Sequence, residues 1–419
     1  MRNTGLAVAA SILAMLHLAV AAPLGVPVAN SSYDTLLTDF FNRTDNQASA
    51  VSDDSTQRQL LTRYVNSGTP IFSQNELTRH STVLVDTGSP YLMLPASNCT
   101  SCGAHTLFDA ALSDTFSASA GTAINPQFAT GADAIPLNQS QGATCYLNAD
   151  TVEFAGLRVQ NQPLLLCDSY APALNDMPID GILGMGLPNE TSAKAWYWNV
   201  YDSGVLQVPE FGLYLIQGTS GLSEMNLGGL DADVYKGNLQ YTRLSDDVSG
   251  KPSGWVIDQQ SVSVGSGGKS VPLLQPRKRD SDRGPPAWAV LDTGTAFIQA
   301  PDKDTAAHFY AQISSDIRMI DPAGAWGADC GTLDKVATAI TFTLGPQSVA
   351  ITRTVPKEEF NLGEYPGQKG ICQAVVNSPG VPSASDSGTP VWVLGSPLLK
   401  QYYTSWDGIN RVVGWAERY

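Results

Sequence analysis

Two short stretches of the sequence place an aspartate in the same local setting. They are Thr82-Val-Leu-Val-Asp86-Thr-Gly-Ser89 and Ala289-Val-Leu-Asp292-Thr-Gly-Thr295. In each, an apolar run ends on the aspartate, and Thr-Gly and a second hydroxyl residue follow. A carboxyl group held in this way is a candidate general acid or base. A single copy would more often be an ordinary turn at a strand end, so the repetition carries the argument.

The residues around each aspartate indicate how it is positioned. The apolar, β-branched run predicts a strand that is buried on both faces, and the glycine permits a tight turn with close backbone approach. A second landmark recurs as Ile182-Leu-Gly184 and Val393-Leu-Gly395, each at a similar distance after its aspartate. Landmarks that repeat in the same order predict two related halves.

With these motifs the chain resembles the pepsin-like aspartic proteases, especially the secreted fungal members. The resemblance covers about Ser81 to Tyr419 and is thin before that. Besides both Asp-Thr-Gly segments, the matching segments in chain order are Asp180-Gly-Ile-Leu-Gly-Met-Gly186, Phe211-Gly-Leu-Tyr-Leu215, Leu227-Gly-Gly-Leu-Asp231, Trp392-Val-Leu-Gly-Ser-Pro-Leu398, Gln401-Tyr-Tyr-Thr-Ser-Trp-Asp407 and Val412-Val-Gly-Trp415. The resemblance implies a mostly β, bilobal fold with lobes 61–240 and 241–419 around a pseudo-two-fold axis and an active-site cleft.

The resemblance also implies a catalytic pair, Asp86 and Asp292, that hydrolyses peptide bonds at acidic pH. Two carboxyls within about 3 Å of each other cannot both ionise, so they share one proton. The ionised member takes a proton from a bound water, and the protonated member hydrogen-bonds the carbonyl oxygen of the substrate. Because the two titrations are coupled, acid and base are not assigned to individual residues.

The remaining residues of both segments are expected to support the pair. The threonines brace the two loops against each other, the glycines let backbone amides approach the carboxylates, and the last hydroxyls orient the outer carboxylate oxygens. These residues are Thr87, Gly88, Ser89, Thr293, Gly294 and Thr295. No cofactor and no metal are expected.

One part of the sequence departs from the family pattern. The family's flap, a hairpin over the cleft, usually carries a tyrosine whose hydroxyl bonds a tryptophan shortly after the first motif. The best match here is Phe128-Ala-Thr-Gly131, and Met93 occupies the tryptophan position. Losing both partners is less damaging than leaving one buried polar group unpaired. This departure keeps an alternative open, a catalytically weak or inactive pepsin-fold protein that binds or inhibits other proteins.

The start of the chain has the layout of an exported precursor. Arg2, an apolar segment from Leu6 to Val20 and the small residues up to Ala21 predict a signal peptide, residues 1–21. We expect a secreted protein, with the vacuole as the alternative destination. The polar residues 22–60 correspond to a propeptide in the family. Family propeptides usually place a lysine over the catalytic aspartates, but no lysine precedes Lys194, so residues 22–60 cannot supply that contact.

Cysteines and glycosylation motifs agree with export. The sequence holds 6 cysteines, an even number that favours disulfides. Closeness in sequence and the family pattern suggest Cys99–Cys102, Cys145–Cys167 and Cys330–Cys372. Cys99 and Cys102 could instead be a redox or zinc pair, but no second Cys-X-X-Cys completes a metal site. Asn-X-Ser/Thr motifs occur at Asn30, Asn42, Asn98, Asn138 and Asn189.

Composition limits the partners. The net charge of −15 disfavours nucleic acids and anionic membranes as partners. Protein or peptide substrates and a monomer are expected, and the sequence contains no Gly-X-Ser-X-Gly or His-Glu-X-X-His motif for another hydrolase mechanism. Short alternating apolar stretches predict mostly strands. Helices are predicted only at 191–202 and 305–315.

A basic stretch precedes the second motif. Residues 275–284 contain Lys278-Arg279 and are followed by two prolines, so they read as an exposed insertion. Exposed polar loops are favoured sites of proteolysis. Cleavage after Arg279 and an uncut solvated loop are the two interpretations, and we predict partial cleavage.

Overall fold

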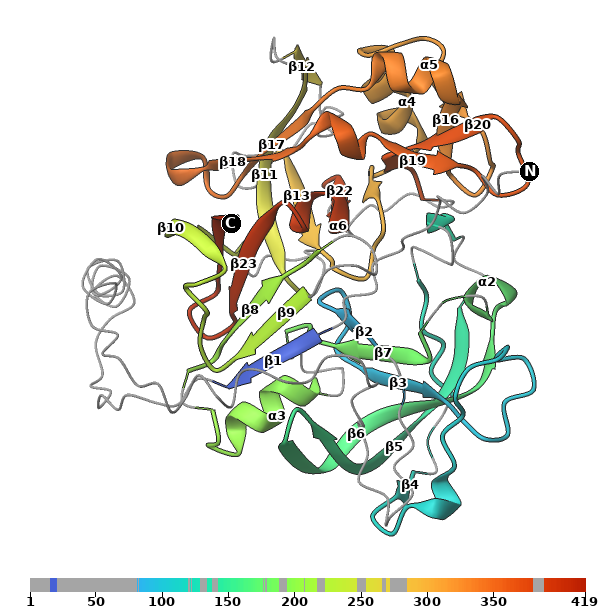
Figure 1. The fold of residues 1–419 in the computed structure, drawn as a ribbon, viewed down its shortest axis with the longest axis vertical. Helices are drawn as coiled ribbons and strands as arrows, with labels where there is room; N and C mark the ends of the chain where they lie inside the picture. Colours follow the sequence, from blue (N-terminus) through green and yellow to red (C-terminus); the bar gives the residue numbers. More distant parts are fainter. Residues whose placement is uncertain are drawn as a thin grey trace, which may run out of the picture.

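The structure is a computed structural model. It describes residues 16–20 by their backbone and most of 81–419, as the folded part of Figure 1 shows. The gaps within the second range are 82, 120, 122, 129–133, 138–141, 176, 178, 188–193, 207, 217–222, 247–253, 266–268, 272–284 and 380–387. The predicted propeptide, the basic loop and the motifs at Asn30, Asn42, Asn138 and Asn189 lie outside the described residues. Asn98 is described and exposed.

The first half of the described chain is built on a 6-stranded sheet with the order β2-β7-β3-β6-β5-β4. Its strands are β2 (Val83–Asp86), β3 (Leu92–Pro95), β4 (Ser117–Ala118), β5 (Ala143–Phe154), β6 (Leu157–Tyr170) and β7 (Gly181–Gly184). β2 runs parallel to β7 and ends on Asp86. The first aspartate therefore stands at the end of a strand, next to the first Ile-Leu-Gly landmark.

The second half repeats this arrangement in an 8-stranded sheet with the order β18-β17-β11-β13-β22-β14-β21, in which β12 pairs with β11. The strands are β11 (Val256–Val264), β12 (Lys269–Val271), β13 (Ala287–Leu291), β14 (Ile298–Gln299), β17 (Ile340–Leu344), β18 (Ile351–Val355), β21 (Val376–Asn377) and β22 (Val391–Leu394). β13 runs parallel to β22, as β2 does to β7.

A smaller sheet completes the second half. Its 4 strands follow the order β15-β16-β20-β19. They are β15 (Arg318–Met319), β16 (Trp326–Asp329), β19 (Asn361–Glu364) and β20 (Ile371–Ala374). In Figure 1, β16, β19 and β20 lie in the upper part of the molecule, opposite β5 and β6 in the lower part.

A 6-stranded sheet with the order β1-β9-β8-β23-β24-β10 joins the halves. Its strands are β1 (Leu16–Val20), β8 (Glu210–Tyr214), β9 (Ser223–Leu227), β10 (Tyr235–Arg243), β23 (Tyr402–Asp407) and β24 (Val412–Arg418). β1 is an edge strand, parallel to β9, and its residues belong to the predicted signal peptide. The prediction of a mostly β fold is confirmed, and the multiple sheets are consistent with the bilobal pepsin-like architecture.

Helices are short and few in the described chain, and their bounds differ from the predicted ones. They are α2 (Pro172–Asn175), α3 (Trp196–Asp202), α4 (Lys303–Ala311), α5 (Cys330–Val336) and α6 (Ser396–Leu399). α4 begins before the predicted position because Asp302 caps it, accepting a hydrogen bond from the amide of Thr305. It also ends before Ser315, at Ala311.

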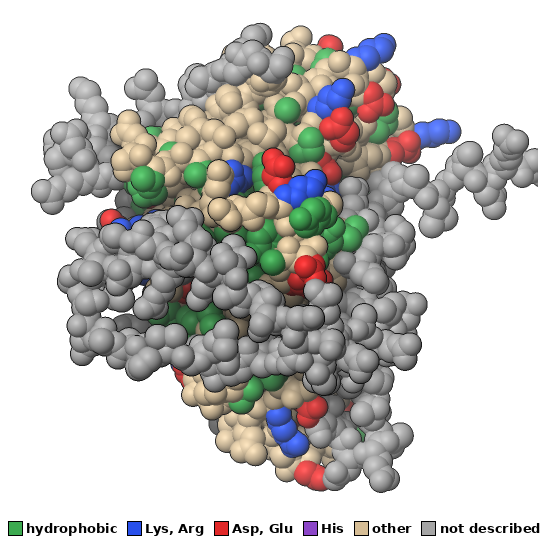
Figure 2. Space-filling model, turned by 60° about the vertical axis from the view of Figure 1, so that its left-hand side comes forward, with side chains coloured by type: hydrophobic (Ala, Val, Ile, Leu, Met, Phe, Trp, Pro, Cys, Tyr) green, Lys and Arg blue, Asp and Glu red, His purple; other side chains and the backbone are tan. Residues whose placement is uncertain are grey.

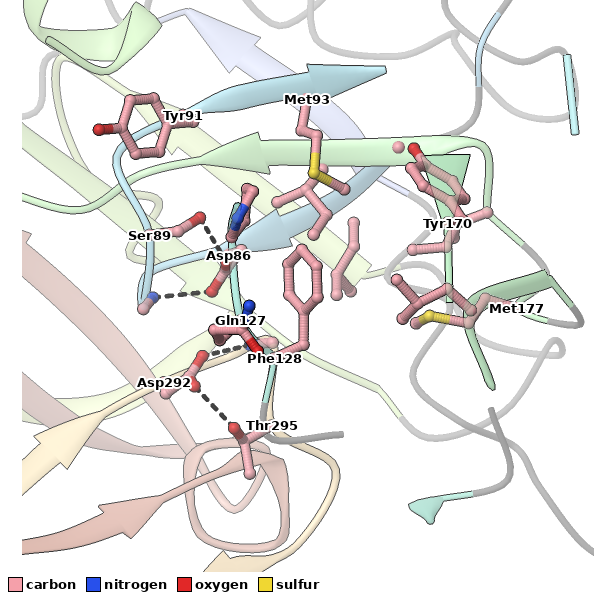
Figure 3. A pocket seen from close by; sticks show the side chains of 18 of the residues that line it. Asp86, Ser89, Tyr91, Met93, Gln127, Phe128, Tyr170, Met177, Asp292 and Thr295 are labelled. Carbon is pink, nitrogen blue, oxygen red and sulfur yellow. Dashed lines mark hydrogen bonds between the residues drawn. The ribbon is translucent and has the colours of Figure 1, made fainter. Parts of the chain in front are cut away.

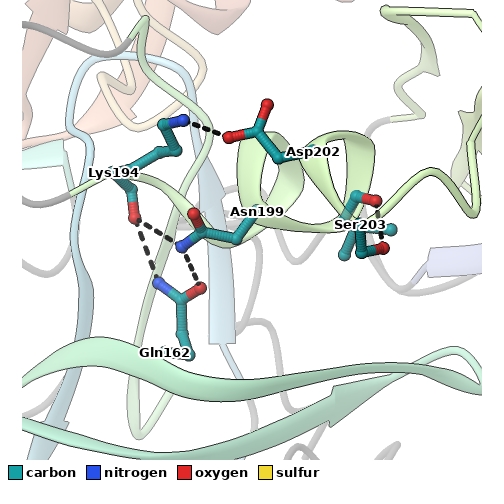
Figure 4. A network of polar contacts seen from close by, with 6 residues as sticks. Gln162, Lys194, Asn199, Asp202 and Ser203 are labelled. Carbon is teal, nitrogen blue, oxygen red and sulfur yellow. Dashed lines mark hydrogen bonds and ion pairs between the residues drawn. The ribbon is translucent and has the colours of Figure 1, made fainter.

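Helix α3 is fixed to the sheet below it by a polar network (Figure 4). The side-chain amide of Gln162, on β6, donates to the carbonyl of Lys194 and accepts from Asn199 on the helix. Lys194 also forms an ion pair with Asp202 at the helix end. Gln162 is fully buried, so these bonds satisfy a side chain that would otherwise be costly to bury.

Three disulfides cross-link the described chain. They are Cys99–Cys102, Cys145–Cys167 and Cys330–Cys372, the pairs that the resemblance implied. Because Cys99 is bonded to Cys102, this pair is not a zinc site. The second bond links neighbouring strands β5 and β6, and the third joins the start of α5 to β20.

One face of the described residues carries side chains of both charges. On the face in Figure 2, lysine and arginine side chains lie among aspartates and glutamates rather than in one block. None of the helices among the described residues has the length and apolar character needed to cross a membrane.

Candidate active site

The two aspartates occupy equivalent positions in the two halves. Asp86 is the last residue of β2, which runs beside the landmark strand β7. Asp292 directly follows β13, which runs beside the landmark strand β22. The glycines of the landmarks have the same function in both halves. A Cβ on Gly184 would lie 2.5 Å from the backbone nitrogen of Tyr91, and one on Gly395 would lie 2.2 Å from the carbonyl oxygen of Thr295. Only glycine allows the turns to approach these strands so closely.

The two turns are joined by reciprocal hydrogen bonds. The backbone amide of Thr87 donates to the hydroxyl of Thr293 over 3.0 Å, and the amide of Thr293 donates to the hydroxyl of Thr87 over 3.1 Å. Each hydroxyl then donates across the interface, Thr87 to the carbonyl of Leu291 and Thr293 to the carbonyl of Val85. Both threonines are buried. This symmetric arrangement fixes the separation of the two strand ends.

Each carboxylate has the same local partners. Oδ1 of Asp86 accepts from the amide of Gly88 over 2.8 Å, and its Oδ2 accepts from the hydroxyl of Ser89 over 2.5 Å. The second half repeats this pattern. Oδ1 of Asp292 accepts from the amide of Gly294 over 2.8 Å, and its Oδ2 accepts from the hydroxyl of Thr295 over 2.6 Å.

The two carboxyls lie against each other. A Cβ on Gly88 would lie 2.6 Å from the carboxyl of Asp292, and one on Gly294 would lie 2.7 Å from Oδ1 of Asp86. Each glycine thus leaves room for the carboxyl of the other half. The pKa of Asp86 is raised well above its usual value, first by burial and then by the charge of Asp292 and a hydrogen bond with it, against the lowering effect of Ser89. Close carboxyls that hold a proton at higher pH can provide both an acid and a base.

A pocket of about 260 Å³ opens from the two aspartates. Figure 3 shows Asp86 and Asp292 at one end, Phe128 beside them, and Tyr170 and Met177 at the far end. Most of the lining side chains are apolar and come from the first half of the chain; they include Leu84, Met93, Phe128, Leu174, Met177, Ile179 and Ile182. The pocket is therefore suited to an apolar side chain placed next to the carboxyl pair.

The structure brings together the two residues that were matched to the altered flap. Phe128 and Met93 both line the pocket, and Phe128 packs against the cluster of buried residues that contains Met93. Gln127, just before Phe128, bridges to Gly142 in antiparallel fashion, and Ile124 bridges to Cys145. Phe128 therefore leaves the end of a short hairpin, while Ala129 to Gly131 lie outside the described residues.

Sequence reasoning did not identify the far wall of the pocket. Tyr170 ends β6, Leu174 lies on α2, and Met177 follows that helix. The sequence contains no signal for them, because isolated apolar residues on a strand end and a helix of one turn look like ordinary core positions. Only the tertiary position of α2 next to the pocket identifies these residues as pocket-lining.

Comparison with known proteins agrees with this geometry. The family model "Eukaryotic aspartyl protease" matches residues 76–418. Pepsin A from Bos taurus is 28% identical over 378 residues, which cover 88% of this chain and 88% of the relative. Cathepsin E from Mus musculus is 27% identical, with 80% and 76% covered. Renin-2 from Mus musculus is 26% identical, with 85% and 81% covered. This chain belongs to the eukaryotic aspartyl protease family.

Proposed function

We propose that the chain is an active aspartic endopeptidase that hydrolyses peptide bonds at acidic pH, with Asp86 and Asp292 as its catalytic residues. The observation that supports this most strongly is the symmetric carboxyl pair: each aspartate is held by its own glycine amide and its own hydroxyl. A structural pair of buried carboxyls would not need to face an open apolar pocket, as this pair does.

In the proposed mechanism the pair holds one water molecule and one proton. The ionised carboxylate removes a proton from the water, which then attacks the peptide carbonyl carbon. The protonated carboxyl donates a hydrogen bond to the carbonyl oxygen, where negative charge develops. Ser89 and Thr295 donate to the outer oxygens, so the inner oxygens are left facing the water. The apolar pocket takes a neighbouring substrate side chain and excludes bulk solvent.

The proposal extends to processing and location. Residues 1–21 would be a signal peptide, 22–60 a propeptide, and the mature lobes would be 61–240 and 241–419. Removal of the signal peptide would take β1 with it and leave β9 at the edge of the joining sheet. A secreted, glycosylated monomer, and a particular similarity to secreted fungal members, stay predictions of the sequence. Cleavage after Arg279 stays one too, and a single full-length band on a denaturing gel would contradict it.

Cleavage of a denatured protein substrate at pH 3 to 7 tests the proposed activity. The wild type is compared with Asp292→Asn, and with Asp304→Asn as a control, because Asp304 is an exposed aspartate on α4. We expect Asp292→Asn to lose roughly 10⁴-fold or more in kcat, as catalytic residues that act as a unit do. The control should cleave like the wild type, and wild-type activity should fall as the pair loses its second proton.

The same assay separates the alternative of a binding or inhibitory protein. That protein would cleave nothing at any pH, and a statine-type peptide would have no activity to abolish. Equal cleavage by wild type and Asp292→Asn would also contradict the proposal, because the activity would then come from elsewhere.

A further inference from the structure

A short segment of the first half, residues 99–106, supports the far wall of the pocket, where Figure 3 shows Tyr170 and Met177. The structure describes every residue of this segment. The disulfide between Cys99 and Cys102 closes its first turn. None of its residues is among the described residues that line the pocket. The segment can therefore affect a bound side chain only through the wall residues that it contacts.

Both ends of the segment are bonded to residues of the far wall. The hydroxyl of Ser101 accepts a hydrogen bond of 3.3 Å from the backbone amide of Tyr170, at the end of β6. The backbone amide of Thr106 donates over 2.7 Å to Oδ1 of Asp180. Tyr170 and Asp180 both line the pocket, and the hydroxyl of Tyr170 donates to the carbonyl of Asp180 over 3.2 Å. The segment is thus fixed to two points of the wall that are also bonded to each other.

His105 makes a third and central contact. Nε2 of its ring lies 3.1 Å from the backbone carbonyl oxygen of Leu174 on α2. Because a carbonyl oxygen can only accept, Nε2 carries the hydrogen and donates it. Nδ1 of the same ring lies 4.0 Å from Oδ1 of Asp180, and the ring packs edge-on against Tyr170 with the ring centroids 5.8 Å apart. One side chain therefore contacts three residues of the pocket lining.

Helix α2 needs such outside contacts to keep its place. It has only 4 residues, and a helix of this length is not stable by itself in water. The side chain of His105 is 6% exposed, so its bond to the helix backbone lies largely away from competing water. The carbonyl of Leu174 also accepts from the amide of Met177 over 3.3 Å. Loss of the histidine would therefore loosen α2 without leaving this carbonyl unpaired.

We propose that His105 is a positioning residue of the substrate pocket: it holds α2 against Asp180 and the end of β6, and so fixes the far wall that receives a large apolar side chain. This rests on the proposed protease function for its kinetic consequences but not for the contacts themselves. A wall that is already fixed costs less ordering when the substrate binds. Removal of His105 should therefore weaken substrate binding and leave the chemical step at the carboxyl pair largely intact.

Two kinds of measurement test this proposal. The first is backbone hydrogen exchange of residues 170–175 in the full chain, with Asp292→Asn to prevent self-digestion. The second is KM and kcat in otherwise wild-type enzyme, for one peptide with a large apolar residue in the pocket and one with alanine there. We expect His105→Ala to speed the exchange and to raise KM for the first peptide roughly fivefold, the loss of about one net hydrogen bond, with kcat little changed. The alanine peptide should show no such rise.

The matched control is His308→Ala. Nδ1 of His308 lies 2.7 Å from the backbone carbonyl oxygen of Asp304 on α4, so this is a second histidine bonded to a helix carbonyl, but in the other half of the chain. The control should leave KM and the exchange of residues 170–175 as in the wild type. If His105→Ala behaves like His308→Ala in both measurements, the proposal is overturned.

His105→Gln and His105→Asn give an independent test that does not require the alanine variant to fold. The amide nitrogen of a glutamine can take the place of Nε2 and donate to the Leu174 carbonyl, whereas an asparagine reaches only the position of Nδ1. The glutamine variant should match the wild type in exchange and KM, and the asparagine variant should show the loosened helix. Equal behaviour of these two variants would overturn the proposal. If the wild type cleaves nothing but the exchange results hold, the protease proposal fails and the contact stands.

Discussion

The two halves of this protein give the carboxyl pair nearly identical hydrogen-bond partners. They differ in the residues that surround the pair and line the pocket. Asp86 and Asp292 have matching amide and hydroxyl partners, with corresponding distances that agree within 0.1 Å. Around Asp86, however, the first half provides the apolar wall from Leu84 to Ile182, whereas the lining residues that the structure describes in the second half are Asp292, Gly294 and Thr295. Under the proposed function, both halves would therefore share the chemistry equally, whereas the apolar pocket for a substrate side chain would come mainly from the first half.

The burial of the two aspartates follows the same asymmetry. Asp86 is 7% exposed, while Asp292 is only partly buried. Burial is the largest cause of the raised pKa of Asp86. Equal local partners therefore do not give equal burial, because burial depends on the surrounding apolar residues rather than on the motif.

The largest expected effect on stability lies in the sheet that joins the halves. Glu210 on β8 is paired directly with Asp407 on β23 and accepts a hydrogen bond of 2.5 Å from Ser405. Burial, with the charge of Asp407 as a smaller cause, raises the pKa of Glu210 to about 7. The charge of Glu210 also helps to raise the pKa of four nearby tyrosines, which are Tyr197, Tyr235, Tyr241 and Tyr403.

The sign of the pH dependence follows from proton counting. The pKa of Glu210 is 4.5 in the unfolded state and about 7 in the folded state. At pH values between these two, the folded state holds a proton on Glu210 that the unfolded state has lost. Stability from this group is complete below pH 4.5 and is lost as pH rises to about 7, for a total of ~3 kcal/mol. Glu210→Gln should remove this loss and so be more stable than the parent at pH 7 but not at pH 4.

Urea unfolding at pH 4, 5, 6 and 7, in the Asp292→Asn background, measures this effect. Glu358→Gln is the control, because Glu358 is exposed. A parallel decline with pH in the parent and in Glu210→Gln would mean that another group causes it. The stability of the sheet that joins the halves would then not depend on the protonation of Glu210.

A smaller and symmetric effect is expected at the threonines. Thr87→Val leaves the buried amide of Thr293 and the carbonyl of Leu291 without a partner, and Thr293→Val does the same to the amide of Thr87 and the carbonyl of Val85. Each substitution should cost about 2 kcal/mol. Urea unfolding in the same background checks this, with the exposed Thr352→Val as the control. Clearly unequal costs would break the symmetry that we describe.

The smallest expected effect comes from a substitution in the apolar pocket wall that the first half provides. Met177→Ala should lower kcat/KM about tenfold for a peptide whose pocket-filling residue is large and apolar, because the lost contacts are worth between one and a few kcal/mol. For a peptide with alanine at that position, kcat/KM should hardly change. Met319→Ala, which is partly buried outside the pocket, should affect neither peptide. Equal losses for both peptides would show that Met177 supports the fold rather than recognition.

Several parts of this protein could be predicted from residues alone. The two Asp-Thr-Gly segments, the two landmarks with an obligatory glycine and the alternating apolar strands are local patterns, because each depends on the backbone geometry within a few residues. A helix near residue 305 was also predicted, although it extends over Lys303–Ala311 rather than over 305–315.

What the sequence by itself determined is therefore the chemistry: which carboxyls, which hydroxyls and which glycines are present, and that they occur twice. Only the tertiary structure decided their surroundings. Leu174 and Met177 line the pocket, and His105 reaches the carbonyl of Leu174, because strands and short helices from distant parts of the chain pack at one place. Neither desolvation nor a contact between distant segments has a local sequence pattern, since both depend on residues that are neighbours in space alone.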